Sequence, residues 1–207
     1  MQMNIINIKY NNLKKYSQLF KLAKPFPHAI LDNFLDENFF KNLNLNEIII
    51  NKKKGRIFNT DIEKNKWASK NEILSNNLKS IIDELNKKDF LENLHKLTGI
   101  TELFSTSEGN TSLANYHEMY ESGFLGTHID HSSEPVTGLP HVLNIILYLS
   151  KNWQKSWGGS TIFANKYGTK IEKLVDFKPN RAVIFLHSPF TFHGVTEIKN
   201  NLNKRST

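Results

Sequence analysis

Residues 141–164 read HVLNIILYLSKNWQKSWGGSTIFA and contain two short apolar runs, 141–150 and 160–164, separated by a polar stretch that ends in Gly158-Gly159. Each run is short for a helix and carries strand-favouring apolar residues, and paired glycines mark turns. The stretch therefore predicts two β-strands with a turn at the glycine pair.

The same pattern of short apolar runs between turn signals continues through the C-terminal half, from about residue 101. The further runs are residues 112–120, 126–130, 171–177, 182–186 and 191–198. Seven or eight short strands at this spacing are typical of a sandwich or a jelly-roll barrel.

The N-terminal half carries helical patterns instead. Residues 24–31 predict an extended entry strand, because each proline disfavours helix in the residue before it. Apolar residues recur with helical spacing in the expected helices, which are residues 36–45, 72–85 and 89–97. Helices first and strands after predict an α+β fold in which the N-terminal helices pack on one sheet of the β core.

The length and composition fit one folded domain. The chain has 207 residues, 39% of them hydrophobic, so we expect a single domain over residues 1–207, with 1–100 as mainly helical support and 101–207 as the barrel. Cysteine is absent, which excludes disulfides, thiolate metal sites and a cysteine nucleophile. No apolar run has the roughly 18 residues of a membrane span, and the N-terminus lacks a secretory pattern. We therefore expect a cytoplasmic location and no membrane partner.

The formal net charge is +7, from 24 Lys and 3 Arg against 20 acidic residues. A basic chain can bind nucleic acid. However, the longest basic cluster, residues 52–56, lacks the interleaved aromatic residues of a base-stacking surface. This pattern favours a solvated loop, so we do not expect a nucleic-acid partner.

A metal-binding pattern lies within one of the expected strands. His128 and Asp130 are two residues apart, so their side chains should share one face, roughly 6.5–7 Å from each other. A third ligand must come from a distant strand, and His193 is the best candidate. Two imidazoles and one carboxylate form a facial triad that binds Fe(II) and leaves coordination positions open. The His-x-Asp pattern alone is a weak signal in a chain with eight histidines.

The C-terminal half, from about residue 112, resembles the 2-oxoglutarate/Fe(II)-dependent dioxygenase superfamily, in particular its prolyl-hydroxylase-like branch. The matching stretches, in the family's order and spacing, are 120–130 (YESGFLGTHID), 143–153 (LNIILYLSKNW), 157–163 (WGGSTIF), 178–185 (KPNRAVIF) and 192–195 (FHGV). The resemblance implies a double-stranded β-helix, a jelly-roll, cupin-like core. It also implies that His128, Asp130 and His193 bind the iron.

The family further requires a basic residue after the second histidine, which holds the distal carboxylate of 2-oxoglutarate. Residues 205–207 supply its Arg-x-Ser/Thr pattern, because Arg205 lies twelve residues after His193. Arginine suits this role, since its planar fork matches a carboxylate with two hydrogen bonds, which lysine cannot provide. Tyr148 matches a family tyrosine that often supports the same carboxylate.

Three further polar side chains are expected to line the pocket. Asn144 has the same strand parity as Tyr148, and Tyr116 and Tyr120 precede His128 on an alternating strand. His131 and His141 are expected at the rim. His187 is left without a role.

The resemblance implies an enzyme that uses Fe(II), 2-oxoglutarate and O2, with ascorbate as an additional reductant. Such an enzyme would hydroxylate an unactivated C–H of a protein side chain or a small metabolite and release succinate and CO2. The sequence carries no signal for the identity of the substrate or for the oligomeric state. The carboxylate of Asp130 disfavours halogenation, because halogenating relatives lack it.

Three other interpretations stay open. The chain could be a cupin-like metal-binding module that works without 2-oxoglutarate, a catalytically silent barrel, or a nucleic-acid demethylase of the same superfamily. The family continues past this arginine into a final strand, whereas this sequence stops at Thr207. We therefore expect a truncated last strand and a weaker carboxylate clamp.

Overall fold

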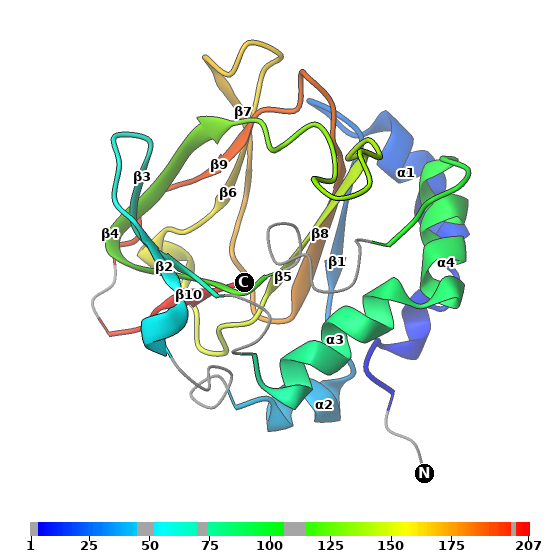
Figure 1. Ribbon diagram of the computed structural model, residues 1–207, viewed down its shortest axis with the longest axis horizontal. Helices are drawn as coiled ribbons and strands as arrows, with labels where there is room; N and C mark the ends of the chain where they lie inside the picture. The colour runs from blue at the N-terminus through cyan, green and yellow to red at the C-terminus, as the bar shows by residue number, and fades with distance from the viewer. Residues whose placement is uncertain (1–3, 45–51, 70–73, 106–114, 200–201) are drawn as a thin grey trace.

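Two antiparallel sheets face each other in the computed structural model, and helices cover the outer side of the smaller one (Figure 1). The structure describes residues 4–44, 52–69, 74–105, 115–199 and 202–207. The smaller sheet has the strand order β1-β8-β5. The larger has the order β2-β3-β4-β9-β6-β7, and β10 pairs with β4 off this path. This arrangement confirms the expected α+β fold with a double-stranded β-helix core.

The helical elements are η1 (Ile8–Tyr10), η2 (Leu13–Tyr16), α1 (Ser17–Leu22), α2 (Glu37–Asn42), η3 (Lys52–Lys54), α3 (Asn76–Asn86), α4 (Lys88–Thr98) and η5 (Lys155–Trp157). The strands are β1 (His28–Asp32), β2 (Arg56–Phe58), β3 (Glu63–Ala68), β4 (His117–His128), β5 (Leu143–Tyr148), β6 (Thr161–Ala164), β7 (Ile171–Val175), β8 (Arg181–Leu186), β9 (His193–Val195) and β10 (Arg205–Ser206).

Capping hydrogen bonds and backbone conformation define the ends of the helices. The Asp36 carboxylate accepts hydrogen bonds from the first backbone N–H groups of α2, and Gly99 ends α4 with a left-handed backbone (φ 80°). Parts of the expected elements, residues 45, 72–73 and 112–114, lie outside the described residues.

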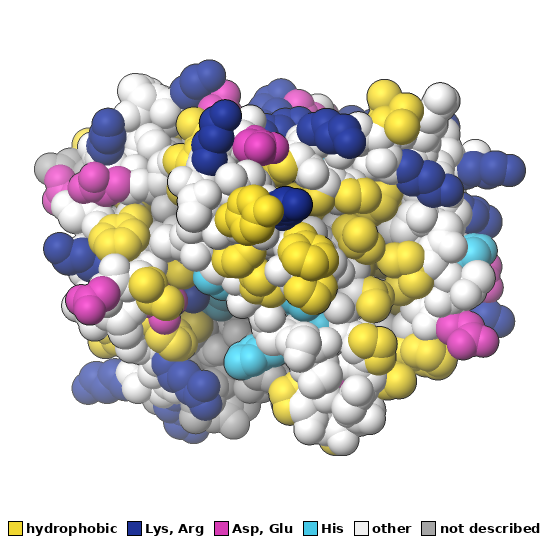
Figure 2. Space-filling view, turned by 90° about the horizontal axis from the view of Figure 1, so that it is seen from above, with side chains coloured by type: hydrophobic (Ala, Val, Ile, Leu, Met, Phe, Trp, Pro, Cys, Tyr) yellow, Lys and Arg dark blue, Asp and Glu magenta, His cyan; other side chains and the backbone are white. Residues whose placement is uncertain are grey.

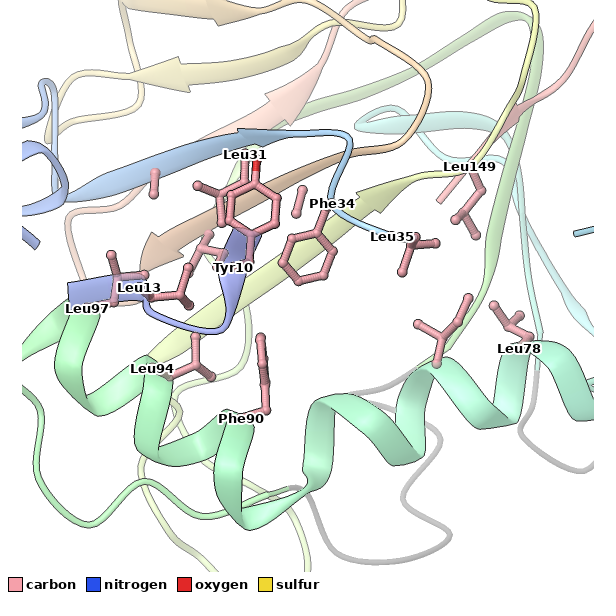
Figure 3. Packing of buried hydrophobic residues seen from close by; sticks show 14 of the residues in the cluster. Tyr10, Leu13, Leu31, Phe34, Leu35, Leu78, Phe90, Leu94, Leu97 and Leu149 are labelled. Atoms are coloured by element: carbon pink, nitrogen blue, oxygen red, sulfur yellow. The ribbon is translucent and has the colours of Figure 1, made fainter. Parts of the chain in front are cut away.

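The helices α1, α3 and α4 pack on the outer face of the smaller sheet (Figure 1). Phe90 and Leu94 of α4 point toward the sheet in Figure 3, where they join Tyr10 and Leu31 in one hydrophobic cluster. This cluster removes the apolar faces of the helices from water, which is the main stabilising contribution to such a layer.

A second cluster fills the space between the two sheets. Along β8, Val183 and Phe185 point into this inner cluster, while Ala182 and Ile184 point toward the helices. The pairing of β5 with β8 runs without a register shift from Leu143 to Tyr148. Every second residue of β5 therefore faces the inside of the barrel.

The strand β4 differs from the expectation. Residues 112–120 and 126–130 were expected as two strands, whereas His117–His128 is one strand and Asp130 lies in the loop after it. Its pairing with β3 and with β9 is interrupted by register shifts, and Ser122 has a left-handed backbone (φ 58°). The strand therefore bends without ending, as bulged strands do.

Among the described residues, no helix has the length and apolar character needed to cross a membrane.

An ion pair joins β1 to β8 at the edge of the smaller sheet. Asp32 and Arg181 face each other in the strand register, and the Arg181 guanidinium donates two hydrogen bonds to the carboxylate, with N–O distances of 2.6 and 3.2 Å. The hydrogen bond from Arg181 lowers the pKa of Asp32 to about 2.

We expect Asp32→Asn to lower the melting temperature at pH 7 by about 2–4 °C, since a partly exposed pair contributes at most about 1 kcal/mol. A carboxyl group with a depressed folded-state pKa stabilises the fold above its unfolded value of about 3.9, and this stabilisation is lost as the pH falls toward 2. The difference between wild type and variant should therefore shrink between about pH 4 and pH 2 in thermal melts. Glu37→Gln removes the exposed pair with Lys41 and should change the melting temperature by less than about 1 °C. A difference that stayed constant down to pH 2 would contradict this assignment.

Candidate active site

Three potential metal ligands meet at the ends of two neighbouring strands. His128 ends β4, His193 begins β9, and the two residues are partners in the strand register. The Nε2 atom of His128 lies 3.4 Å from Asp130 Oδ1, and that of His193 lies 3.4 Å from Asp130 Oδ2. The ligand atoms of the three residues lie within 4.8 Å of one another, so one metal ion could contact all three.

Both imidazoles have their Nε2 atom available for a metal. The Nδ1 atom of His128 lies 3.0 Å from the carbonyl oxygen of Gly126, and that of His193 lies 3.2 Å from the carbonyl oxygen of Thr191. A proton on Nδ1 donates to the carbonyl in each case, which leaves the Nε2 lone pair free. Outer hydrogen bonds of this kind orient metal-binding histidines in many proteins.

The protonation states also suit metal binding. Burial lowers the pKa of His193 to about 4, so its imidazole is neutral at neutral pH. Burial alone would raise the pKa of Asp130, but its interactions with the side chains of His128 and His193 hold it well below its usual value. At neutral pH, Asp130 is therefore a carboxylate, the form in which it can be a ligand.

Asn144 orients the carboxylate. It lies on β5, which faces the triad from the opposite sheet, and its side-chain Nδ2 donates a 2.9 Å hydrogen bond to Asp130 Oδ2. Asn144 therefore contacts a candidate metal ligand.

A cavity of about 770 Å³ connects the triad with Arg205. Its wall includes His128, Asp130, His193, Asn144 and Arg205. Figure 2 shows histidine side chains in a recess of the surface, with hydrophobic side chains beside it. The metal-ligand set and the basic side chain thus share one cavity.

Arg205 is buried, and part of its guanidinium group lacks a partner. Its Nε donates a 2.9 Å hydrogen bond to the carbonyl oxygen of Gly159, but its Nη2 is the one buried side-chain polar atom of the described residues without a hydrogen-bond partner. A buried unpaired donor on a cation is costly. A ligand carboxylate entering the cavity would satisfy it, so the residues present fit a carboxylate co-substrate.

Aromatic rings and a glycine hold the arginine in place. The Arg205 guanidinium carbon lies 5.4 Å from the centroid of the Tyr148 ring and 5.2 Å from that of Phe177. These two rings are stacked, and the Tyr148 hydroxyl lies 2.5 Å from Thr161 Oγ1. At Gly159 (φ 71°), a Cβ atom would lie 3.1 Å from Arg205 Cδ, so the side chain packs directly on the glycine.

Tyr120 of β4 and Tyr116, the residue directly before β4, lie on the opposite face of the chain from the inner cluster. Tyr116 is part of the helix-side cluster, touches the edge of the cavity and has its hydroxyl 2.9 Å from Ser206 Oγ. Tyr120 lies outside this cavity, with its hydroxyl hydrogen-bonded to the carboxylate of Glu118. The inner face of this part of β4 is formed instead by His117 and Met119.

Sequence reasoning missed several residues at this site. His117 on the cavity wall, Phe177 against Arg205 and the buried Glu118 carry no motif. His141 and His187 stack with ring centroids 4.4 Å apart, and His187 Nε2 lies 3.3 Å from the backbone oxygen of Asp130. Counting strand positions in steps of two within the first part of β4, and not back from His128, would have indicated His117.

Residues 112–207 match the family described as the 2OG-Fe(II) oxygenase superfamily. A search of curated proteins finds no match. The chain therefore matches the 2OG-Fe(II) oxygenase superfamily over its C-terminal segment, and the resemblance noted in the sequence is confirmed. It is an enzyme of the 2-oxoglutarate-dependent dioxygenase class, whose cofactors are Fe(II), 2-oxoglutarate and O2.

Several solved structures with a similar fold are prolyl hydroxylases. A prolyl-4-hydroxylase from Pseudomonas putida superposes with a TM-score of 0.63 at 14% identity, covering 94% of each chain. A prolyl hydroxylase from Trichoplax adhaerens, solved with a hypoxia inducible factor peptide fragment, gives 0.59 at 15% identity over 96% of this chain and 87% of that one. A collagen prolyl hydroxylase from Paramecium Bursaria Chlorella virus-1, solved with 2-oxoglutarate, gives 0.55 at 12% identity over 89% and 94%. At these identities the likeness defines the fold.

We expect Asp130→Ala and His193→Ala each to weaken Fe(II) binding by more than about 100-fold, because each removes a ligand, and even groups that only orient a ligand typically contribute 10–100-fold. Anaerobic titration with Fe(II), followed by the rise in melting temperature, measures this loss. His95→Ala, which changes an exposed histidine on α4, should leave the titration unchanged. Wild-type affinity in either ligand variant would rule out this site.

Proposed function

We propose that this chain is a non-haem Fe(II) dioxygenase that hydroxylates an unactivated C–H bond and converts 2-oxoglutarate and O2 to succinate and CO2. His128, Asp130 and His193 hold the Fe(II) ion in this proposal. Arg205 holds the distal carboxylate of 2-oxoglutarate, with Tyr148 beside it.

The observation that carries the proposal is the buried arginine with an unpaired Nη2 in the wall of the cavity that also contains the triad. A protein that bound only a metal would gain nothing from leaving the Arg205 Nη2 without a partner in the wall of this cavity. A dicarboxylate with one end at the metal and the other at Arg205 accounts for both features, because it would satisfy the guanidinium with charge-assisted hydrogen bonds.

Each residue of the candidate site has a defined task in this proposal. The backbone carbonyl groups of Gly126 and Thr191 hold the imidazoles so that Nε2 faces the metal position. Asn144 holds Asp130 through one carboxylate oxygen. Tyr148 and Phe177 exclude water from the guanidinium, which strengthens its interaction with a carboxylate. When bound, Fe(II) and 2-oxoglutarate supply the oxidising chemistry, and the protein supplies position and shelter.

The substrate is a protein side chain or a small metabolite. The Trichoplax relative was solved with a peptide fragment, which supports a peptidyl substrate for this fold. The cavity volume of about 770 Å³ is within the range of ligand pockets and would also admit a small molecule. The triad retains its carboxylate, which supports hydroxylation as the outcome.

The direct test is spectroscopic. Anaerobic protein loaded with Fe(II) should develop a visible charge-transfer band when 2-oxoglutarate is added, and air should then produce succinate slowly even without substrate. Iron binding with neither band nor succinate would favour a cupin-like site that works without 2-oxoglutarate. Failure to bind iron would favour a silent barrel.

We expect Arg205→Lys to raise the 2-oxoglutarate concentration that gives half of the charge-transfer band by about 10–100-fold. The reason is that a hydrogen bond to a charged group contributes about 1.5–3 kcal/mol, and lysine cannot reproduce the two-pronged geometry. Fe(II) binding should change by less than about twofold, because Arg205 is not among the three ligand residues. Arg56→Lys on β2, an exposed arginine, is the matched control and should behave as wild type. Unchanged 2-oxoglutarate affinity in Arg205→Lys would remove the arginine from the proposal.

A further inference from the structure

Glu118 is a fully buried carboxylate that the proposed chemistry does not use. It lies on β4 with 0% of its surface exposed, on the strand face that points away from the inner cluster. The Lys204 ammonium group donates to Oε1, and the Tyr120 hydroxyl donates to Oε2. The Tyr116 hydroxyl lies 3.2 Å from Oε1. Burying a charge in this way is costly unless it is paired, so the position calls for an explanation.

The strand that carries Arg205 is very short. β10 consists of Arg205 and Ser206, which pair with Met119 and Glu118 of β4. Its other edge is fixed at Ser206, whose N–H donates to Ser150 Oγ at 2.7 Å and whose carbonyl oxygen accepts from Leu149 N–H at 2.9 Å. Thr207 adds two backbone hydrogen bonds with His117, but the strand remains short, so side-chain contacts contribute to its position.

Glu118 interacts with one neighbour of Arg205 in the chain directly and with the other through Tyr116. It binds Lys204 through an ion pair. The Tyr116 hydroxyl links it to Ser206, because that hydroxyl lies 3.2 Å from Glu118 Oε1 and 2.9 Å from Ser206 Oγ. Residues 204 and 206 have the same parity along the strand, and Arg205 has the opposite one. The carboxylate therefore fixes one face of β10 while the guanidinium points from the other face into the cavity.

We propose that Glu118 is a positioning residue, which sets the place of Arg205 in the cavity by anchoring Lys204 and Ser206 on either side of it. This inference rests on the proposed function, because it assigns Arg205 to the carboxylate of 2-oxoglutarate. Glu118 is not among the residues that line the cavity with the candidate metal ligands and Arg205. Its effect on 2-oxoglutarate binding is transmitted through the backbone of β10.

The test compares Glu118→Gln with Asp32→Asn, which removes a different partly buried ion pair, between β1 and β8. Calorimetry measures the affinity of the Mn(II)-loaded chain for 2-oxoglutarate and, separately, the affinity of the chain for Mn(II). Hydrogen exchange measures protection of the Ser206 and Thr207 amides, which donate to Ser150 Oγ and to the carbonyl oxygen of His117. Lys204→Met is the second variant, since its side chain is 25% exposed and its loss is easier for the fold to tolerate.

We expect Glu118→Gln to weaken 2-oxoglutarate binding about tenfold, a typical effect of removing a group that orients a binding residue. Mn(II) affinity should change by less than about twofold, and the two amides should exchange faster than in Asp32→Asn. Lys204→Met should act in the same direction, and adding it to Glu118→Gln should have little further effect, because the pair is already broken.

Two results would overturn the inference. One is a 2-oxoglutarate affinity in Glu118→Gln and Lys204→Met that falls no further than in Asp32→Asn. The other is an equal loss of Mn(II) and 2-oxoglutarate binding, which indicates general damage to the fold. If the wild-type protein binds no 2-oxoglutarate, the proposed function fails, and hydrogen exchange of the Ser206 amide alone tests the anchoring of β10. Faster exchange in Glu118→Gln supports the anchoring, and unchanged exchange refutes it.

Discussion

The antiparallel pairing of β4 with β9 is the contact on which the rest of the site depends. It places His128 opposite His193, although the two lie far apart in the sequence, and it brings both next to Asp130 in the loop after β4. β9 is in turn paired with β6, where Phe163 lies opposite His193 and belongs to the aromatic inner cluster. The metal-binding geometry is therefore a property of the assembled barrel, and no single segment carries it.

Sequence patterns predicted the site where the strands are regular. On β5 the pairing with β8 is continuous, so the equal parity of Asn144 and Tyr148 placed both on the inner face, one beside Asp130 and the other beside Arg205. The family motif supplied the three candidate ligands and the position of Arg205 in the chain. The helices α2, α3 and α4 were predictable because their amphipathic pattern matches the face that they bury, whereas α1 was not predicted.

The same reasoning was less useful where the backbone is irregular or the contact is long-range. Counting back from His128 in steps of two points to Tyr120 and Tyr116, but the register shift between Leu125 and His128 reverses the face that points inward. His117 therefore lies on the cavity wall, whereas Tyr116 joins the helix-side cluster while still touching the cavity, and Tyr120 lies outside it. The partners of Arg205 come from distant loops, and no local pattern marks Phe177 or Gly159 for that task.

Gly159 supports Arg205 but not the metal-ligand triad. Its carbonyl oxygen holds the Arg205 Nε, and its missing side chain leaves the space that the arginine stem occupies. One added methyl group would press on that stem and on Trp153, whereas the triad has its own separate supports in Gly126 and Thr191. Under the proposed function, a change at this one glycine would therefore alter co-substrate binding while the metal ligands keep their supports.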